Sequence, residues 1–107
     1  MATDIPRGQV RGIDLLEVVL SPATVATTTS AEQTFTVKGL KLHDWVNVNK
    51  PTAQAGLGIV GARVTAADTL GITFANVTSG TLTPTTSETY TIMRCSPVTL
   101  PVPSAIA

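Results

Sequence analysis

The chain has 107 residues, a formal net charge of zero at neutral pH and a pI near 6.5. Charged residues make up 13% of it, and aromatic residues only 4%. This length fits one domain, and the balanced charge without a basic cluster argues against a nucleic-acid-binding protein. The single cysteine, Cys95, excludes an intrachain disulfide framework and a cysteine-paired zinc site, and it fits maturation in a reducing compartment.

The N-terminal sequence lacks the pattern of a secretory signal, which is a positively charged segment followed by an apolar one. No apolar run approaches the roughly 18 residues that a membrane-spanning helix needs. We therefore expect a protein that is neither exported through a signal peptide nor anchored in a membrane.

Residues 1–12 carry Pro6, Gly8 and Gly12 without an apolar period, which predicts an extended N-terminal arm. Such an arm is either solvated or docked on a neighbouring subunit. Residues 13–20 (IDLLEVVL) permit a short helix or a strand. The paired valines and the Ser-Pro step that follows favour the strand.

The next segments alternate between turns and strands. Residues 21–30 are rich in Thr, Ser and Pro, which predicts a loop or an edge strand with a turn. Residues 31–38 form a strand pattern with Gln33, Phe35 and Val37 on one face. Trp45–Asn49 (WVNVN) is the next predicted strand, with its two valines on one face. The following proline ends it, because proline has no amide hydrogen for the ladder.

A hairpin is predicted in the second half of the chain. Residues 59–66 (IVGARVTA) place Val60, Ala62 and Val64 on one side, and Gly61 suggests a bulge. Ala67-Asp68 is short enough for the turn, but it lacks the favoured Asn-Gly chemistry, so we expect a slightly longer loop. The partner strand follows at residues 70–77, with Leu70, Ile72 and Phe74 facing one way.

The last strand is predicted at residues 88–95 (ETYTIMRC), after a turn-rich connector. Tyr90, Ile92 and Arg94 share one face of it. The tail, residues 96–107 (SPVTLPVPSAIA), has three prolines among apolar residues, which block a helix and bias the chain toward polyproline II. We predict that this uncharged arm packs on its own domain or on a neighbour.

These segments together predict an all-β fold, either an antiparallel β-sandwich or a jelly-roll-like small barrel of six to eight strands. The domain would span residues 13–95, flanked by extended arms at residues 1–12 and 96–107. No βαβ pattern, internal repeat or second domain is visible.

Candidate catalytic and metal-binding residues are few. His43 is the only histidine and is followed by Asp44, but no nucleophile motif accompanies them, so a solvent-facing turn is the favoured interpretation of His43. Asp68 is interpreted as a turn residue that accepts hydrogen bonds from nearby backbone amides. The sequence therefore predicts no enzyme, no catalytic residue, no cofactor site and no metal site.

Four other features favour structural interpretations. Gly56 and Gly58 lack the third glycine and the helix of a phosphate loop, which favours a tight loop between strands. The sequon at Asn76 is incidental without an export signal. The aromatic pair of the only Trp and the only Tyr could form a sugar-stacking platform, although packing is the favoured interpretation. Cys95 is interpreted as a small buried residue on the last strand.

Residues 31–94 resemble a family of small structural proteins of tailed bacteriophages. The resemblance is carried by the segments AEQTFTVKGL, DWVNVNKPTAQAGLGIVGARVTAADTLGITFANVT, TLTPTTS and ETYTIMR. Its most specific part is NKPTAQAGLGIVGARVTAADTLGITFANVT. Both arms lie outside it. The family brings no catalytic residues, so none are carried over to this chain.

The resemblance implies a capsid decoration or cement protein of the virion, made in the cytoplasm of the host bacterium. Its expected partner is the outer face of the major capsid protein lattice, which it would stabilise, with neither nucleic acid nor membrane as partner. A homotrimer is the first expectation and a dimer the second. The alternative is a head-fibre or tail-fibre module that binds a host-surface glycan, tested through Trp45 and Tyr90.

Overall fold

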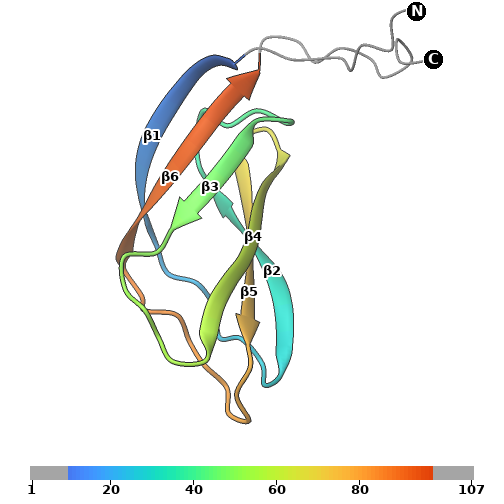
Figure 1. The fold of residues 1–107 in the computed structure, drawn as a ribbon, viewed down its shortest axis with the longest axis vertical. Helices are drawn as coiled ribbons and strands as arrows, with labels where there is room; N and C mark the ends of the chain where they lie inside the picture. Colours follow the sequence, from blue (N-terminus) through green and yellow to red (C-terminus); the bar gives the residue numbers. More distant parts are fainter. Residues whose placement is uncertain (1–9, 98–107) are drawn as a thin grey trace, which may run out of the picture.

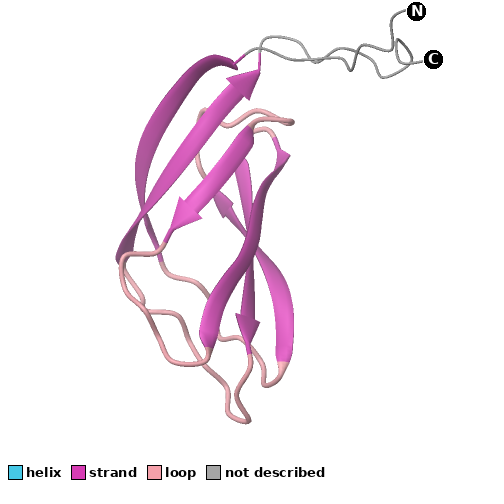
Figure 2. Ribbon diagram, viewed as in Figure 1, coloured by secondary structure: helices cyan, strands magenta, loops and turns pink. Residues whose placement is uncertain are grey.

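The computed structural model describes residues 10–97, and this part of the chain contains strands and loops but no helix (Figure 2). The six strands are β1 (Val10–Leu20), β2 (Thr29–Thr36), β3 (Trp45–Asn49), β4 (Leu57–Ala66), β5 (Thr69–Asn76) and β6 (Glu88–Pro97). The prediction of an all-β fold is confirmed, and its strand number lies at the lower end of the predicted range.

The strands form two three-stranded sheets, here called sheet I (β1-β6-β3) and sheet II (β2-β5-β4). Every neighbouring pair is antiparallel. The two sheets lie over one another, and every connection except the β4–β5 hairpin crosses from one sheet to the other (Figure 1). The architecture is therefore an interleaved antiparallel sandwich of two separate sheets, which is one of the two predicted alternatives.

The core lies between the sheets and is built from every second residue of each strand. Leu70, Ile72 and Phe74 of β5 have no exposed surface, and neither do Tyr90 and Ile92 of β6. These rows confirm the alternation predicted for both strands. The other buried residues of the hydrophobic core cluster are Leu20, Val25, Val37, Leu40, Val46 and Val64.

The alternation predicted for residues 59–66 is wrong at its first two residues, because Ile59 is predicted to face away from Ala62 and Val64, and Val60 to face with them. The β4–β5 register shifts between Ile59 and Gly61, which is the bulge that Gly61 suggested. Because a bulge inserts an extra residue, Ile59 and Ala62 both pack against the core. Val60, predicted to share the face of Ala62 and Val64, is 68% exposed instead.

The β4–β5 turn consists of Ala67 and Asp68 alone, so the expected longer loop is wrong. The short turn is made possible by a positive φ at Asp68 and by a register shift between Val64 and Ala66. The Asp68 carboxylate does accept a backbone amide, but from Gly39 (N···Oδ1 2.8 Å), which is distant in sequence. It therefore ties the hairpin to the β2–β3 connection.

The first and last strands are longer than predicted at the ends that face the arms. β1 begins at Val10 rather than at residue 13, and β6 continues to Pro97 rather than ending at residue 95. Val10 and Pro97 are register partners. The arm predictions for residues 1–9 and 98–107 lie outside the described residues.

Candidate interaction surface

The histidine and aspartate considered for catalysis have separate surroundings. His43 is exposed and has a left-handed backbone (φ 78°), which confirms the solvent-facing turn. Asp44 is buried, and its Oδ2 accepts the amide of Lys41 at 3.0 Å. The same oxygen lies 3.9 Å from a guanidinium nitrogen of Arg94. Asp44 thus stabilises the turn of the β2–β3 connection, and its carboxylate contacts Lys41 and Arg94 rather than the imidazole of His43.

Arg94 joins three parts of the sandwich at the end where the chain enters and leaves. Its guanidinium pairs with Asp14 on the neighbouring strand β1. It also donates to the carbonyl oxygen of Gly39 at 2.6 Å, in the turn after β2. These bonds fasten β1, β6 and the β2–β3 connection to one another.

A second ion pair lies near the opposite end of sheet I. Lys50 Nζ is 3.1 Å from Glu88 Oε1, and both side chains are about nine-tenths buried. Thr52 donates a hydrogen bond of 2.5 Å to Glu88 Oε2. This hydrogen bond, together with Lys50, lowers the pKa of Glu88 from its usual value of 4.5 despite the burial. The cluster connects β6 to the loop after β3.

Asn76 is a buried structural residue that the sequence marks only as part of a sequon. Its Nδ2 donates to the carbonyl oxygens of Val25 (3.2 Å) and Gly80 (2.8 Å). Its Oδ1 accepts both the amide and the hydroxyl of Thr78, at 2.9 and 2.7 Å. With 1% exposure and all four bonds made inside the protein, this amide is closed to a glycosylating enzyme.

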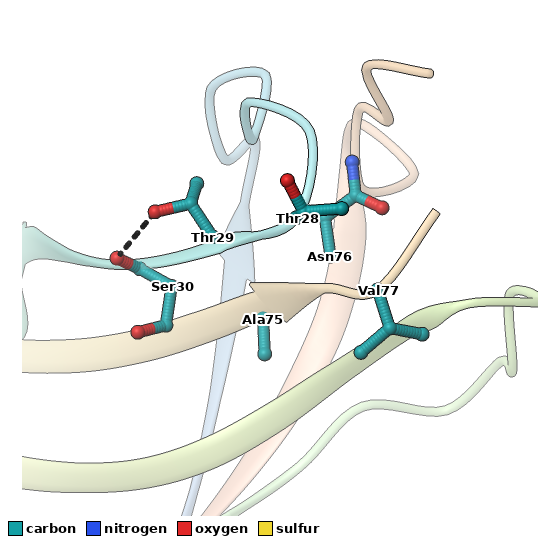
Figure 3. Close-up of a pocket in the computed structure, with 6 residues that line it drawn as sticks. All are labelled: Thr28, Thr29, Ser30, Ala75, Asn76 and Val77. Carbon is teal, nitrogen blue, oxygen red and sulfur yellow. Dashed lines mark hydrogen bonds between the residues drawn. The ribbon is translucent and has the colours of Figure 1, made fainter. Parts of the chain in front are cut away.

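The region around the two glycines is the tight loop that the sequence predicted. Gly56 has a φ of 77°, and its carbonyl oxygen accepts the amide of Val77 at 2.9 Å. A hollow opens at the same end of sheet II (Figure 3). Its lining is Thr28, Thr29, Ser30, Ala75, Asn76 and Val77. None of these side chains is charged, and the amide of Asn76 is engaged elsewhere, so this hollow offers no group for acid–base chemistry.

The aromatic pair does not form a platform. Tyr90 is fully buried on the inner side of sheet I, whereas Trp45 is 54% exposed on its outer side. Packing is therefore confirmed for Tyr90 and wrong for Trp45. Cys95, predicted to be buried, is only partly buried and lies opposite Trp45 in the register. Trp45 and Cys95 belong to one outward row.

The outer face of sheet I is apolar at the end where the chain enters and leaves. Register places Ile13, Cys95 and Trp45 in one row across the sheet, and Leu15, Met93 and Asn47 in the next. The side chains of Ile13, Leu15 and Trp45 are more than half exposed. We call these six residues, with Val19 further along β1, the sheet I patch.

The sheet I patch borders a hollow of about 200 Å³ on the same face. Its lining is Leu15, Asn47, Val48, Asn49, Thr91 and Met93. The patch and the hollow together contain no charged side chain. Glu17, which pairs with Thr91 in the register, lies on the same face beside the hollow, between Leu15 and Val19. Surfaces of this kind bind apolar or neutral protein surfaces rather than ions.

Within residues 10–97, no group of three or more His, Cys, Asp or Glu side chains lies close enough to hold a metal ion. The same residues contain no helix that is long and apolar enough to span a bilayer. Comparisons with family profiles, with curated proteins and with solved structures gave no match.

Proposed function

We propose that this protein is a non-enzymatic structural protein of a tailed-phage virion, a decoration or cement protein that binds the outer face of the capsid lattice and stabilises the head. The class comes from the sequence resemblance. The observation that supports the docking mode is the pairing of Val10 with Pro97. Because of this pairing, the points where the two predicted arms join the sandwich lie on adjacent strands.

A small body gains binding area most readily through arms. The sandwich holds the base of both arms with the β1–β6 ladder and with the Asp14–Arg94 pair. Because that base is already ordered, it loses little further conformational freedom on binding, which favours affinity. Residues 98–107 contain no charged side chain and are mostly aliphatic or proline, a composition that suits an apolar groove on the lattice.

The test is the copy number on purified heads that lack the protein. Chains without residues 1–9 or without residues 98–107 retain the whole described sandwich, and each should occupy the heads at least about tenfold more weakly than the full chain. Val60→Glu, a change of an exposed residue on sheet II, serves as control and should bind normally. Full occupancy by a chain that lacks both arms would contradict the docking mode.

The glycan-binding alternative now depends on Trp45 alone, because Tyr90 is buried. Trp45→Ala would remove glycan binding without changing the fold, whereas Tyr90→Ala would remove core packing and is not a clean control. Loss of binding to glycan arrays in Trp45→Ala, with head occupancy unchanged, would favour the fibre-module alternative.

A further inference from the structure

The sheet I patch is larger than folding requires. Ile13, Leu15, Val19 and Trp45 are 64%, 70%, 62% and 54% exposed. Together they expose on the order of 500 Å² of apolar surface, within the range of the largest patch on a monomer, although Glu17 separates Val19 from the other three residues. Outward strand positions need no apolar residue for the protein's own core, so another surface is expected to cover this one.

The same face carries both a projection and a depression. Trp45 projects at the start of β3, and the hollow beside it is lined by residues of the two following rows, together with Val48 of β3. Two residues along a strand span roughly 7 Å, so Trp45 and the hollow lie within one side-chain length of each other. A two-fold axis between them would bring each Trp45 over the hollow of a second copy.

We propose that the outer face of sheet I is the interface of a symmetric homodimer, in which Trp45 of each copy inserts into the hollow bounded by Leu15 and Met93 of the other. A two-fold interface uses the same patch on both copies, so a projection and a depression on one flat face complement themselves. A trimeric ring needs its two complementary surfaces on different sides of the protomer. The dimer is therefore favoured over the trimer, which was the first expectation from the resemblance.

The area and the charge of the patch agree with a second copy as its occupant. Covering the patch on both copies buries roughly 1,000 Å², the lower limit for a specific interface. Glu17 lies between Leu15 and Val19 beside the hollow, and a two-fold axis near Trp45 keeps the two Glu17 side chains on opposite sides of that axis. Tryptophan is also among the residues that most often dominate the binding energy of an interface.

The dimer does not depend on the proposed virion function, so purified protein without capsids is sufficient to test it. Sedimentation equilibrium should give a monomer–dimer equilibrium in the micromolar range. Trp45 is the only tryptophan, so its fluorescence should shift to longer wavelength on dilution, as the indole becomes exposed to water. A wild-type protein that stays monomeric at about 100 µM, or that forms trimers, overturns the proposal.

Two variants test the contact itself. Trp45→Glu and Leu15→Lys should each weaken dimerisation about 1,000-fold, because symmetry repeats each loss of roughly 30-fold at two sites. Val60→Glu, which adds a charge at an exposed position on sheet II, should dimerise normally. Circular dichroism and melting temperature verify that each variant is folded.

A mixture of the two variants gives the most specific test. In the mixed dimer, one site pairs the new carboxylate of the Trp45→Glu chain with the new ammonium group of the Leu15→Lys chain. The other site keeps its original tryptophan and leucine. Mixing should therefore restore a heterodimer that neither variant forms with itself, detectable by mass difference after tagging one of them. If mixing restores nothing while both single variants are monomeric, Trp45 does not contact the Leu15 hollow and the proposed geometry is wrong.

Discussion

The two outer faces of the sandwich differ, although the inner faces of both sheets are alike. Sheet II presents mostly Thr, Ser, Ala and Gly to the outside, together with the exposed Val60 and one ion pair between Glu32 and Arg63. Sheet I presents Ile13, Leu15 and Trp45. Outward positions add little to the protein's own core, and the apolar face of sheet I is the one on which we propose the dimer interface.

The ion pair between Glu32 and Arg63 covers part of the outer face of sheet II with the protein's own side chains. Arg63 Nε lies 2.8 Å from Glu32 Oε2, across the central strand. The pair spans Gly71, where an added Cβ would come within 2.7 Å of that oxygen. The hydrogen bond to Arg63 lowers the pKa of Glu32. This face covers its own central strand, whereas the face of sheet I leaves its apolar residues exposed.

The largest difference in unfolding free energy is expected between substitutions at two neighbouring residues of β6. Ile92 points into the core with no exposure, and Met93 points outward. Ile92→Ala should lower the free energy of unfolding by about 3 kcal/mol, through lost contacts and a cavity. Met93→Ala should lower it by less than about 1 kcal/mol in dilute, monomeric protein. Urea denaturation measures both, and equal losses would contradict the assignment of faces.

Asn76 should give the next largest effect. It continues the inward row of Leu70, Ile72 and Phe74 on β5, but with a polar side chain. Asn76→Ala leaves buried carbonyl and amide groups without their partner, and should cost about 2 kcal/mol of unfolding free energy. Thr73→Ala, an outward change on the same strand, is the control and should cost less than about 0.5 kcal/mol. A milder loss at residue 76 than at residue 73 would contradict the structural role of Asn76.

Tyr90 reports on the inner face of sheet I, as Trp45 reports on its outer face. Burial, with the nearby charge of Glu88, raises the pKa of Tyr90 to about 12 from its usual 10. The folded protein therefore holds this proton more tightly than the unfolded chain. The corresponding stability is present below pH 10 and is lost as the pH rises from 10 toward 12.

Tyr90→Phe removes this alkaline loss and, at neutral pH, should change stability by no more than about 1 kcal/mol, because the hydroxyl has no hydrogen-bond partner among the described residues. As Tyr90 is the only tyrosine, its phenolate absorbance can be titrated directly in the folded protein. Titration near the ordinary value of 10 would mean that the ring is not buried.

The smallest effect should come from the outer face of sheet II. Glu32→Gln removes one partner of an ion pair whose arginine is mostly exposed. The melting temperature should fall slightly at low salt and should match the wild type in molar salt, because exposed charges are screened. A loss that persists in high salt would indicate that this face depends on the pair for more than charge.

Much of the fold is predictable because a strand has a simple period. Alternating β-branched residues identify β3 and β5 closely, and they place the row of Leu70, Ile72 and Phe74 correctly in the core. The prediction for Val60 is wrong, because a glycine suggests a bulge but does not say on which side the extra residue falls. The predicted ends of β1 and β6 are also wrong, since the ladder continues past the glycine at position 12.

The candidate surface cannot be read from the sequence in the same way. Leu15 and Met93 are far apart along the chain, and only the antiparallel register of β1 and β6 makes them neighbours. Likewise, the pattern Asn76-Val77-Thr78 matches a sequon whatever the surrounding structure is. Only the folded loops bring the carbonyl oxygens of Val25 and Gly80 to the side-chain amide of Asn76.

The sequence by itself thus determined which segments are strands and which residues of β5 and β6 point inward, because local alternation and β-branched side chains act within one strand. Only the tertiary structure decided that Ile13, Leu15, Met93 and Trp45 form one exposed apolar face. The physical reason is that a strand's period sets two faces, whereas pairing between distant strands decides which residues meet on each face and which face the second sheet covers.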